Sequence, residues 1–135
     1  MPTRRASYDY ALIRVVPRVE RGECMNVGVA LFCRTRAFLG ARVALDEARL
    51  RAFFPQADVE DIQAQLDAIT KIAQGASSAG PIGALSQAER FHWLVSPRST
   101  IVQPSPVHSG LCADPPAALD HLFETMVRLP SDAEA

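Results

Sequence analysis

The chain has 135 residues, of which 48% are hydrophobic and 21% are charged, and its formal net charge at pH 7 is −1. This length is typical of one domain with a single core, and charged residues interrupt every apolar stretch well before the roughly 20 residues that a membrane-spanning helix needs. We therefore expect one domain over residues 1–135 and no membrane association. Three cysteines are an odd number in a chain that buries a core, so we expect reduced thiols and a cytoplasmic protein without a signal peptide.

The charges are distributed unevenly along the chain. Residues 1–51 hold ten arginines and five acids, a net +5, whereas residues 52–135 hold four basic groups and ten acids, a net −6. A basic half could attract phosphate groups, because the arginine guanidinium matches phosphate oxygens. The alternative is that the two halves fold against each other and their fields largely cancel, which is the interpretation we favour.

The first part of the chain has the pattern of a β-meander. Tyr8–Val16 and Met25–Cys33 are rich in aromatic and β-branched residues, and Phe38–Ala44 follows a short polar turn of hairpin length. We predict three antiparallel strands here. The second strand contains neither proline nor charge, so we expect it to be central or buried.

Two helices are predicted next. Asp46 can cap a helix that runs to about Phe54, where Pro55 stops it. Asp58 begins a clearer helix that ends at Gly75 and carries a stripe of apolar residues at steps of three and four. We expect this stripe to face the core; it consists of Val59, Ile62, Leu66, Ile69 and Ile72.

The C-terminal part predicts a hairpin and a last helix. Ser86 and Glu89 match a capping box, after which Phe91–Val95 is interpreted as a strand, and Thr100–Gln103 as its partner across a turn. Asp114 and Pro115 open a helix whose stripe includes Leu119, Leu122, Phe123 and Met126. The predicted fold class is therefore α+β: an antiparallel sheet, made of a three-stranded meander and a C-terminal hairpin, packed against two to three helices.

Two stretches are polar where folding alone does not require polarity. The first joins the first two strands and contains Arg21, Glu23, Asn26 and Gly28. Strand interiors disfavour asparagine and glycine. One interpretation is a β-bulge at Gly28 with Asn26 bonded to a neighbouring loop, and the other is a binding site.

The second polar stretch runs from residue 96 to residue 110. Arg98, with the neighbouring hydroxyls of Ser99 and Thr100, could hold an anionic group, and His108 could transfer a proton near neutral pH. Hydroxyl residues beside prolines, such as Ser105, are also ordinary turn chemistry. The predicted ligand-binding residues are Arg21, Glu23, Asn26, Arg98, Ser99, Thr100, Ser105 and His108.

The same two stretches carry a resemblance to a bacterial family of unknown function, DUF3037. It rests on residues 10–17 and 21–29, and on Phe91-His92-Trp93-Leu94, Ser96–Thr100 and Ser105–His108. The resemblance implies no reaction, cofactor or catalytic residue. It does imply a protein partner, because such genes often lie beside genes for HipA-like kinases.

We expect a non-enzymatic binding or accessory protein that acts with a protein partner or an anionic ligand. One alternative is a small hydrolase or phosphoryl-transfer enzyme in which Arg98 binds an anion, His108 moves a proton and Glu23 orients it. No Cys-x-x-Cys pair or nucleotide-binding glycine loop occurs, so we expect neither a metal nor a cofactor. The other alternative is nucleic-acid binding through arginines at strand ends and turns, namely Arg4, Arg5, Arg18, Arg21, Arg34 and Arg36.

We also expect a homodimer or a complex with another protein. A meander leaves sheet edges that must be paired, covered or blunted. The first or third strand should be such an edge, unless the predicted hairpin joins the sheet and covers it.

Overall fold

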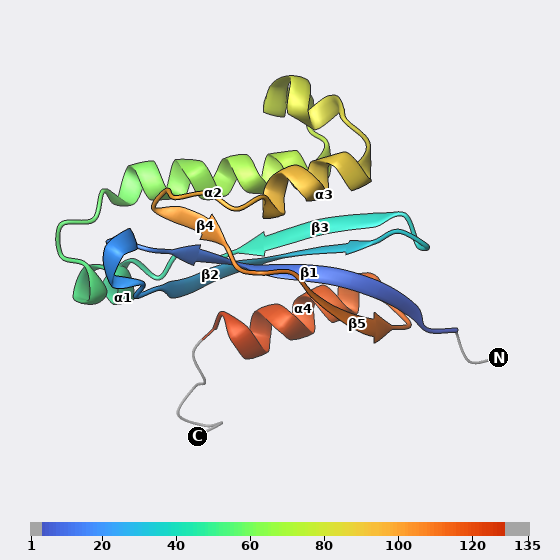
Figure 1. Cartoon of the computed structure of the whole chain (residues 1–135), viewed down its shortest axis with the longest axis horizontal. Coiled ribbons are helices and arrows are strands. Elements are labelled where there is room, and N and C mark those ends of the chain that lie inside the picture. Colours follow the sequence, from blue (N-terminus) through green and yellow to red (C-terminus); the bar gives the residue numbers. More distant parts are fainter. Residues whose placement is uncertain (1–3, 129–135) are drawn as a thin grey trace.

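The computed structural model describes residues 4–128 as an antiparallel sheet with helices on both faces (Figure 1). The strands are β1 (Ala6–Val15), β2 (Met25–Cys33), β3 (Phe38–Val43), β4 (Val102–Pro104) and β5 (His108–Cys112). Their order is β3-β2-β1-β4, and β5 also pairs with β1. The predicted α+β class and the three-stranded meander are confirmed.

β4 and β5 lie end to end along the free side of β1. β4 pairs with residues 13–15 of β1, and β5 pairs with residues 6–10. The prolines at 104 and 106 interrupt this side of the sheet, because proline has no N–H to donate. Ser105 fills the gap: its N–H donates to the carbonyl of Leu12 at 2.7 Å, and its hydroxyl accepts from the Leu12 N–H at 2.8 Å. The Ser105 hydroxyl thus takes the place of the backbone carbonyl that a regular neighbouring strand would offer to the Leu12 N–H.

α2 (Val59–Gln74) and α3 (Gln87–Val95) cover one face of the sheet, with a 3-10 segment, η2 (Ser77–Ala84), between them (Figure 1). Asp58 caps α2 by accepting from the Asp61 N–H at 3.0 Å, and Gly75 ends it in the left-handed conformation, as predicted. The predicted stripe faces the core: Ile62, Leu66 and Ile72 are buried, and Val59 and Ile69 pack against them.

α1 (Glu47–Phe53) and α4 (Pro115–Met126) complete the helices of the described chain. Asp46 caps α1 by accepting from the Arg49 N–H at 3.1 Å. α4 packs on the opposite face of the sheet from α2 and α3, burying Leu119, Leu122 and Phe123 against Val29 and Leu31. Met126, predicted on the same stripe, is exposed, and Val127 directly after the helix is buried in its place.

The predicted hairpin is wrong in its first strand. Phe91–Val95 belongs to helix α3, and β4 pairs with β1. The Ser86–Glu89 capping box is present and begins a helix of nine residues, in which Phe91 and Leu94 are buried three positions apart. Helical spacing of buried residues therefore outweighs the strand preference of this aromatic and β-branched segment.

The strand order resolves the question of the sheet edges. β2 lies inside the sheet, as predicted, and β1 also lies inside because β4 and β5 cover its free side. β3 is one edge of the sheet.

Gly28 forms the bulge that its position in β2 predicts. The β1–β2 register shifts between Ile13, opposite Gly28, and Arg14, opposite Asn26. A Cβ atom at residue 28 would lie 2.8 Å from the Arg42 carbonyl oxygen and 2.8 Å from Val43 Cγ1 on β3. The position is therefore a close backbone approach between two strands.

Candidate functional site

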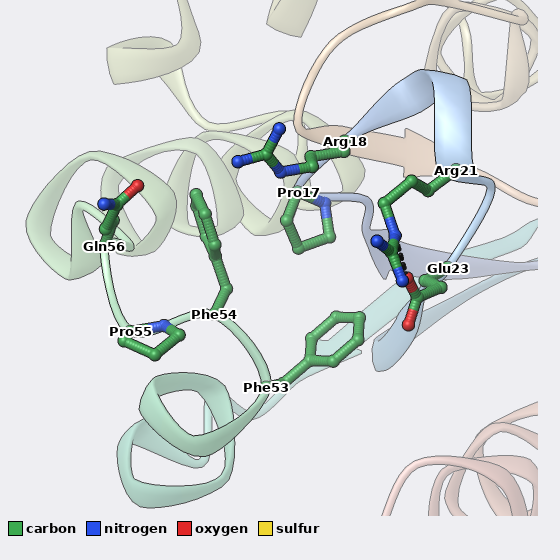
Figure 2. A pocket seen from close by; sticks show the side chains of 8 residues that line it. All are labelled: Pro17, Arg18, Arg21, Glu23, Phe53, Phe54, Pro55 and Gln56. Atoms are coloured by element: carbon green, nitrogen blue, oxygen red, sulfur yellow. Dashed lines mark hydrogen bonds and ion pairs between the residues drawn. The ribbon is translucent and has the colours of Figure 1, made fainter.

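A cavity of about 380 Å³ opens between the β1–β2 connection and the α1–α2 connection (Figure 2). The first connection includes a 3-10 turn, η1 (Val19–Arg21). Both connections are short segments between regular elements, which is where binding residues concentrate in folded domains. We call this hollow the loop cavity; it is lined by Pro17, Arg18, Arg21, Glu23, Phe53, Phe54, Pro55 and Gln56.

The charged side of the loop cavity is partly organised. Arg21 donates from Nε to a Glu23 carboxylate oxygen, and both side chains remain more than half exposed (Figure 2). Arg18 approaches Glu20 at 4.0 Å, a looser pair. Exposed pairs of this kind contribute little to stability, and both lie beside the cavity.

The opposite side of the loop cavity is apolar. α1 ends at Phe53, and Phe54 follows as its C-terminal cap, with non-helical backbone angles, before Pro55. Both phenylalanine rings are half-buried and keep surface open to the cavity. The loop cavity therefore combines guanidinium groups with aromatic rings, the side chains most enriched at recognition surfaces.

Asn26 lies apart from the loop cavity. Its side-chain amide donates to the Met126 carbonyl at 3.1 Å, at the end of α4. The last carbonyls of a helix have no partner within the helix, so this bond satisfies one of them. The sequence left two interpretations of this stretch, a binding site or a β-bulge with a hydrogen-bonded asparagine. The structure contains the bulge and the hydrogen bond.

Arg98 is fixed against the end of α3. Its guanidinium lies 4.7 Å from the centroid of the Trp93 ring, and its Nη2 donates to the Trp93 carbonyl at 2.8 Å. Ser99 and Thr100 are exposed beside it, and the Thr100 hydroxyl donates to the Val102 carbonyl at 2.7 Å. This arginine therefore helps to end the helix, with the indole ring as its platform.

Ser105 and His108 belong to the region where β4 gives way to β5. Ser105 is buried and completes the pairing with β1 as described above. His108 is exposed at the start of β5, opposite Tyr10, with the two ring centroids 5.5 Å apart.

The structure brings Arg21 and Glu23 together and places the other predicted residues elsewhere. His108 lies opposite Tyr10, whereas β2 begins opposite Val15 and Glu23 precedes β2. Five residues along β1 correspond to about 16 Å at a rise of about 3.3 Å per residue. A catalytic pair needs a separation of about 3 Å or one bridging water, so the arrangement does not favour the Arg98, His108 and Glu23 enzyme.

Sequence reasoning missed the aromatic half of the loop cavity. Phe53 and Phe54 are adjacent, and α1 ends at the first of them. Because Pro55 follows immediately, the second ring falls outside the helix. A pair of phenylalanines at a predicted helix end was therefore a usable signal.

Two other properties bear on the class of site. Among residues 4–128, no group of three or more His, Cys, Asp or Glu side chains is placed to hold a metal ion. Over the same described range, no helix is long and apolar enough to cross a bilayer.

The comparison with known families agrees with the resemblance in the polar stretches. A family described as "Protein of unknown function (DUF3037)" matches residues 10–127. The chain belongs to the DUF3037 family. No curated protein and no solved structure shows a significant match. The family description assigns no activity to this DUF3037 protein.

Proposed function

We propose that this DUF3037 protein is a non-enzymatic accessory protein that binds a partner protein through the loop cavity. The observation that carries the proposal is the pairing of two arginines with two half-buried phenylalanine rings around one hollow, formed by two loops. A scaffold needs only turn residues at such connections.

The residues that line the loop cavity indicate which kind of partner segment would bind there. Among the lining residues, Arg18 and Arg21 carry two positive charges and Glu23 one negative charge, so the lining itself is net positive. Glu20, which approaches Arg18 at 4.0 Å, does not line the cavity. The phenylalanine rings supply apolar surface that gains stability when water is displaced. The preferred occupant is therefore a partner segment that presents a carboxylate beside an apolar side chain, and a small anionic ligand with an apolar body is the other class that would fit.

The identity of the partner follows from the family only by association. The resemblance to DUF3037 suggests a HipA-like kinase as the first protein to test. A second copy of the chain is the other candidate, since β3 leaves one edge of the sheet. A solution mass of a single 14.7 kDa chain at micromolar concentration would exclude the homodimer.

The first prediction concerns variants of the loop cavity. A tagged chain purified from its native cell should retain a partner, and either Phe54→Ala or Arg21→Glu should reduce the recovered partner at least tenfold. Losing a central aromatic or arginine contact commonly costs about 2 kcal/mol or more, and about 1.4 kcal/mol corresponds to a factor of ten.

Arg51→Ala is the matched control for these variants. Arg51 lies on α1 and pairs with Glu47 at 2.9 Å, but it does not line the loop cavity. Its partner recovery should equal that of the unmodified chain. If Phe54→Ala and Arg21→Glu retain the partner to the same degree as Arg51→Ala, the loop cavity is not the binding site.

A further inference from the structure

The face of the sheet that carries α4 is covered only in part. α4 packs on β2 and β3, whereas β1 and β5 extend beyond it. Tyr8 and Tyr10 lie two positions apart on β1, and both pack at the margin of the α4 core cluster. His108, opposite Tyr10, shares this face because directly paired residues of antiparallel strands point the same way.

These three rings form a continuous aromatic strip. The Tyr8 and Tyr10 centroids are 6.0 Å apart, and those of Tyr10 and His108 are 5.5 Å apart. Tyr8 lies over Gly110 of β5, where an added Cβ would come within 2.6 Å of the ring. The ring therefore rests on the strand backbone. The tyrosines are half-buried and the histidine is exposed.

One end of this strip is rich in arginine. β1 begins, β2 ends and β5 ends on the same side of the molecule (Figure 1), which gathers the segments 4–6, 33–38 and 112–115. Arg36 ties them together: it donates to the Ala113 carbonyl at 3.2 Å and also to the Arg4 carbonyl. The three segments contain four arginines and one acid, and the set consists of Arg4, Arg5, Arg34, Arg36 and Asp114.

The other end of the strip has donors without acceptors. Arg14 lies four residues after Tyr10 on the same face of β1, beyond Leu12, and is paired in register with Gln103 of β4. Arg14 Nε and Gln103 Nε2 are both buried and lack a hydrogen-bond partner. Buried donors are usually satisfied, so these two neighbouring donors leave unused hydrogen-bonding capacity at this end of the strip.

We propose that the open half of this face binds single-stranded nucleic acid, with bases stacked on Tyr8, Tyr10 and His108 and phosphates held by the arginines at the two ends. Aromatic side chains on a sheet, flanked by positive charge, are the general means by which proteins hold unpaired bases. Burial, with smaller contributions from Tyr10 and Cys112, raises the pKa of Tyr8 and keeps this phenol neutral at physiological pH. The proposal is independent of the loop cavity.

Fluorescence anisotropy with labelled oligouridylate and oligothymidylate tests this proposal on the whole chain. We expect binding at low salt that weakens as salt rises, by about 0.7 log units per log of salt for each phosphate contacted. Tyr10→Ala should weaken binding about fivefold or more, because a base stack is worth about 1–3 kcal/mol, whereas Tyr10→Phe should retain it. Arg34→Glu should weaken binding and reduce the salt dependence.

Two controls keep the outcome decisive. Arg51→Ala, which changes an arginine on α1, should leave the affinity unchanged. Thermal unfolding of the Tyr10 variants shows whether the fold is intact, and the Phe variant keeps the test valid if the Ala variant unfolds. Two results would overturn the proposal. One is no binding at low salt, and the other is that Tyr10→Ala and Arg34→Glu both bind as tightly as the unmodified chain.

Discussion

Replacing Ser105 with alanine is expected to lower the free energy of unfolding by about 1–3 kcal/mol, the cost of leaving a buried backbone donor without an acceptor. The Leu12 N–H donates to the Ser105 hydroxyl at 2.8 Å in a buried position. Leu12 lies in β1, which is paired on both sides, so no water replaces the lost acceptor. Urea unfolding followed by circular dichroism measures the difference.

Ser99→Ala is the matched control for Ser105→Ala. Ser99 is exposed in the connection that precedes β4, and a surface change of this kind usually alters stability by less than about 0.5 kcal/mol. Equal unfolding midpoints for the two variants would show that the Ser105 hydroxyl does not maintain the pairing with β1.

Gly28→Ala is expected to destabilise the fold by about 1–3 kcal/mol or more, because the added methyl overpacks a closed site. The new Cβ would lie 2.8 Å from the Arg42 carbonyl oxygen and 3.1 Å from Ile13 Cδ1. The backbone oxygen belongs to the neighbouring strand β3 and cannot move without disturbing the sheet.

A double variant separates backbone crowding from side-chain crowding at this bulge. Val43 Cγ1 is the other atom at 2.8 Å, and Val43→Ala removes it. We expect Gly28→Ala to remain destabilising in the Val43→Ala background, as measured by thermal unfolding, because the Arg42 carbonyl is unchanged. Full recovery of stability there would contradict the close backbone approach.

Local sequence signals predicted those elements in which the spacing of apolar side chains and the residues at the ends indicate the same helix or strand. Asp58 and Gly75 mark both ends of α2, and the bounds of β2 coincide with the predicted Met25–Cys33. Capping and alternation act within a few residues, so they can be detected in the sequence without knowledge of the neighbours.

The errors arose where pairing or packing over long sequence distances decides the structure. Phe91–Val95 has strand-forming residues, but its burial against α2 and the sheet selects a helix. No local pattern predicts β5, because His108, Ser109 and Gly110 lack the alternation of a strand; it forms because residues 6–10 of β1 offer a free edge. Such tertiary effects override local preference.

In the candidate site, too, local sequence signals found some residues, and residues that long-range packing brings in were missed. Arg21 and Glu23 were found because they are polar beside a strand, and they do line the loop cavity. Phe53 and Phe54 come from a connection about thirty residues further along the chain, and only the fold places them opposite. Polarity alone therefore identified two of the eight residues that line the cavity, Arg21 and Glu23.

Site-specific photo-crosslinking in the native cell tests the proposed function most directly. Gln56 lines the loop cavity, and Ala68 is exposed on α2 outside it. The account predicts that p-benzoylphenylalanine at position 56 crosslinks a discrete partner, that Phe54→Ala abolishes this crosslink, and that the same probe at position 68 gives none. A partner captured from position 68 but not from position 56 would contradict binding at the loop cavity.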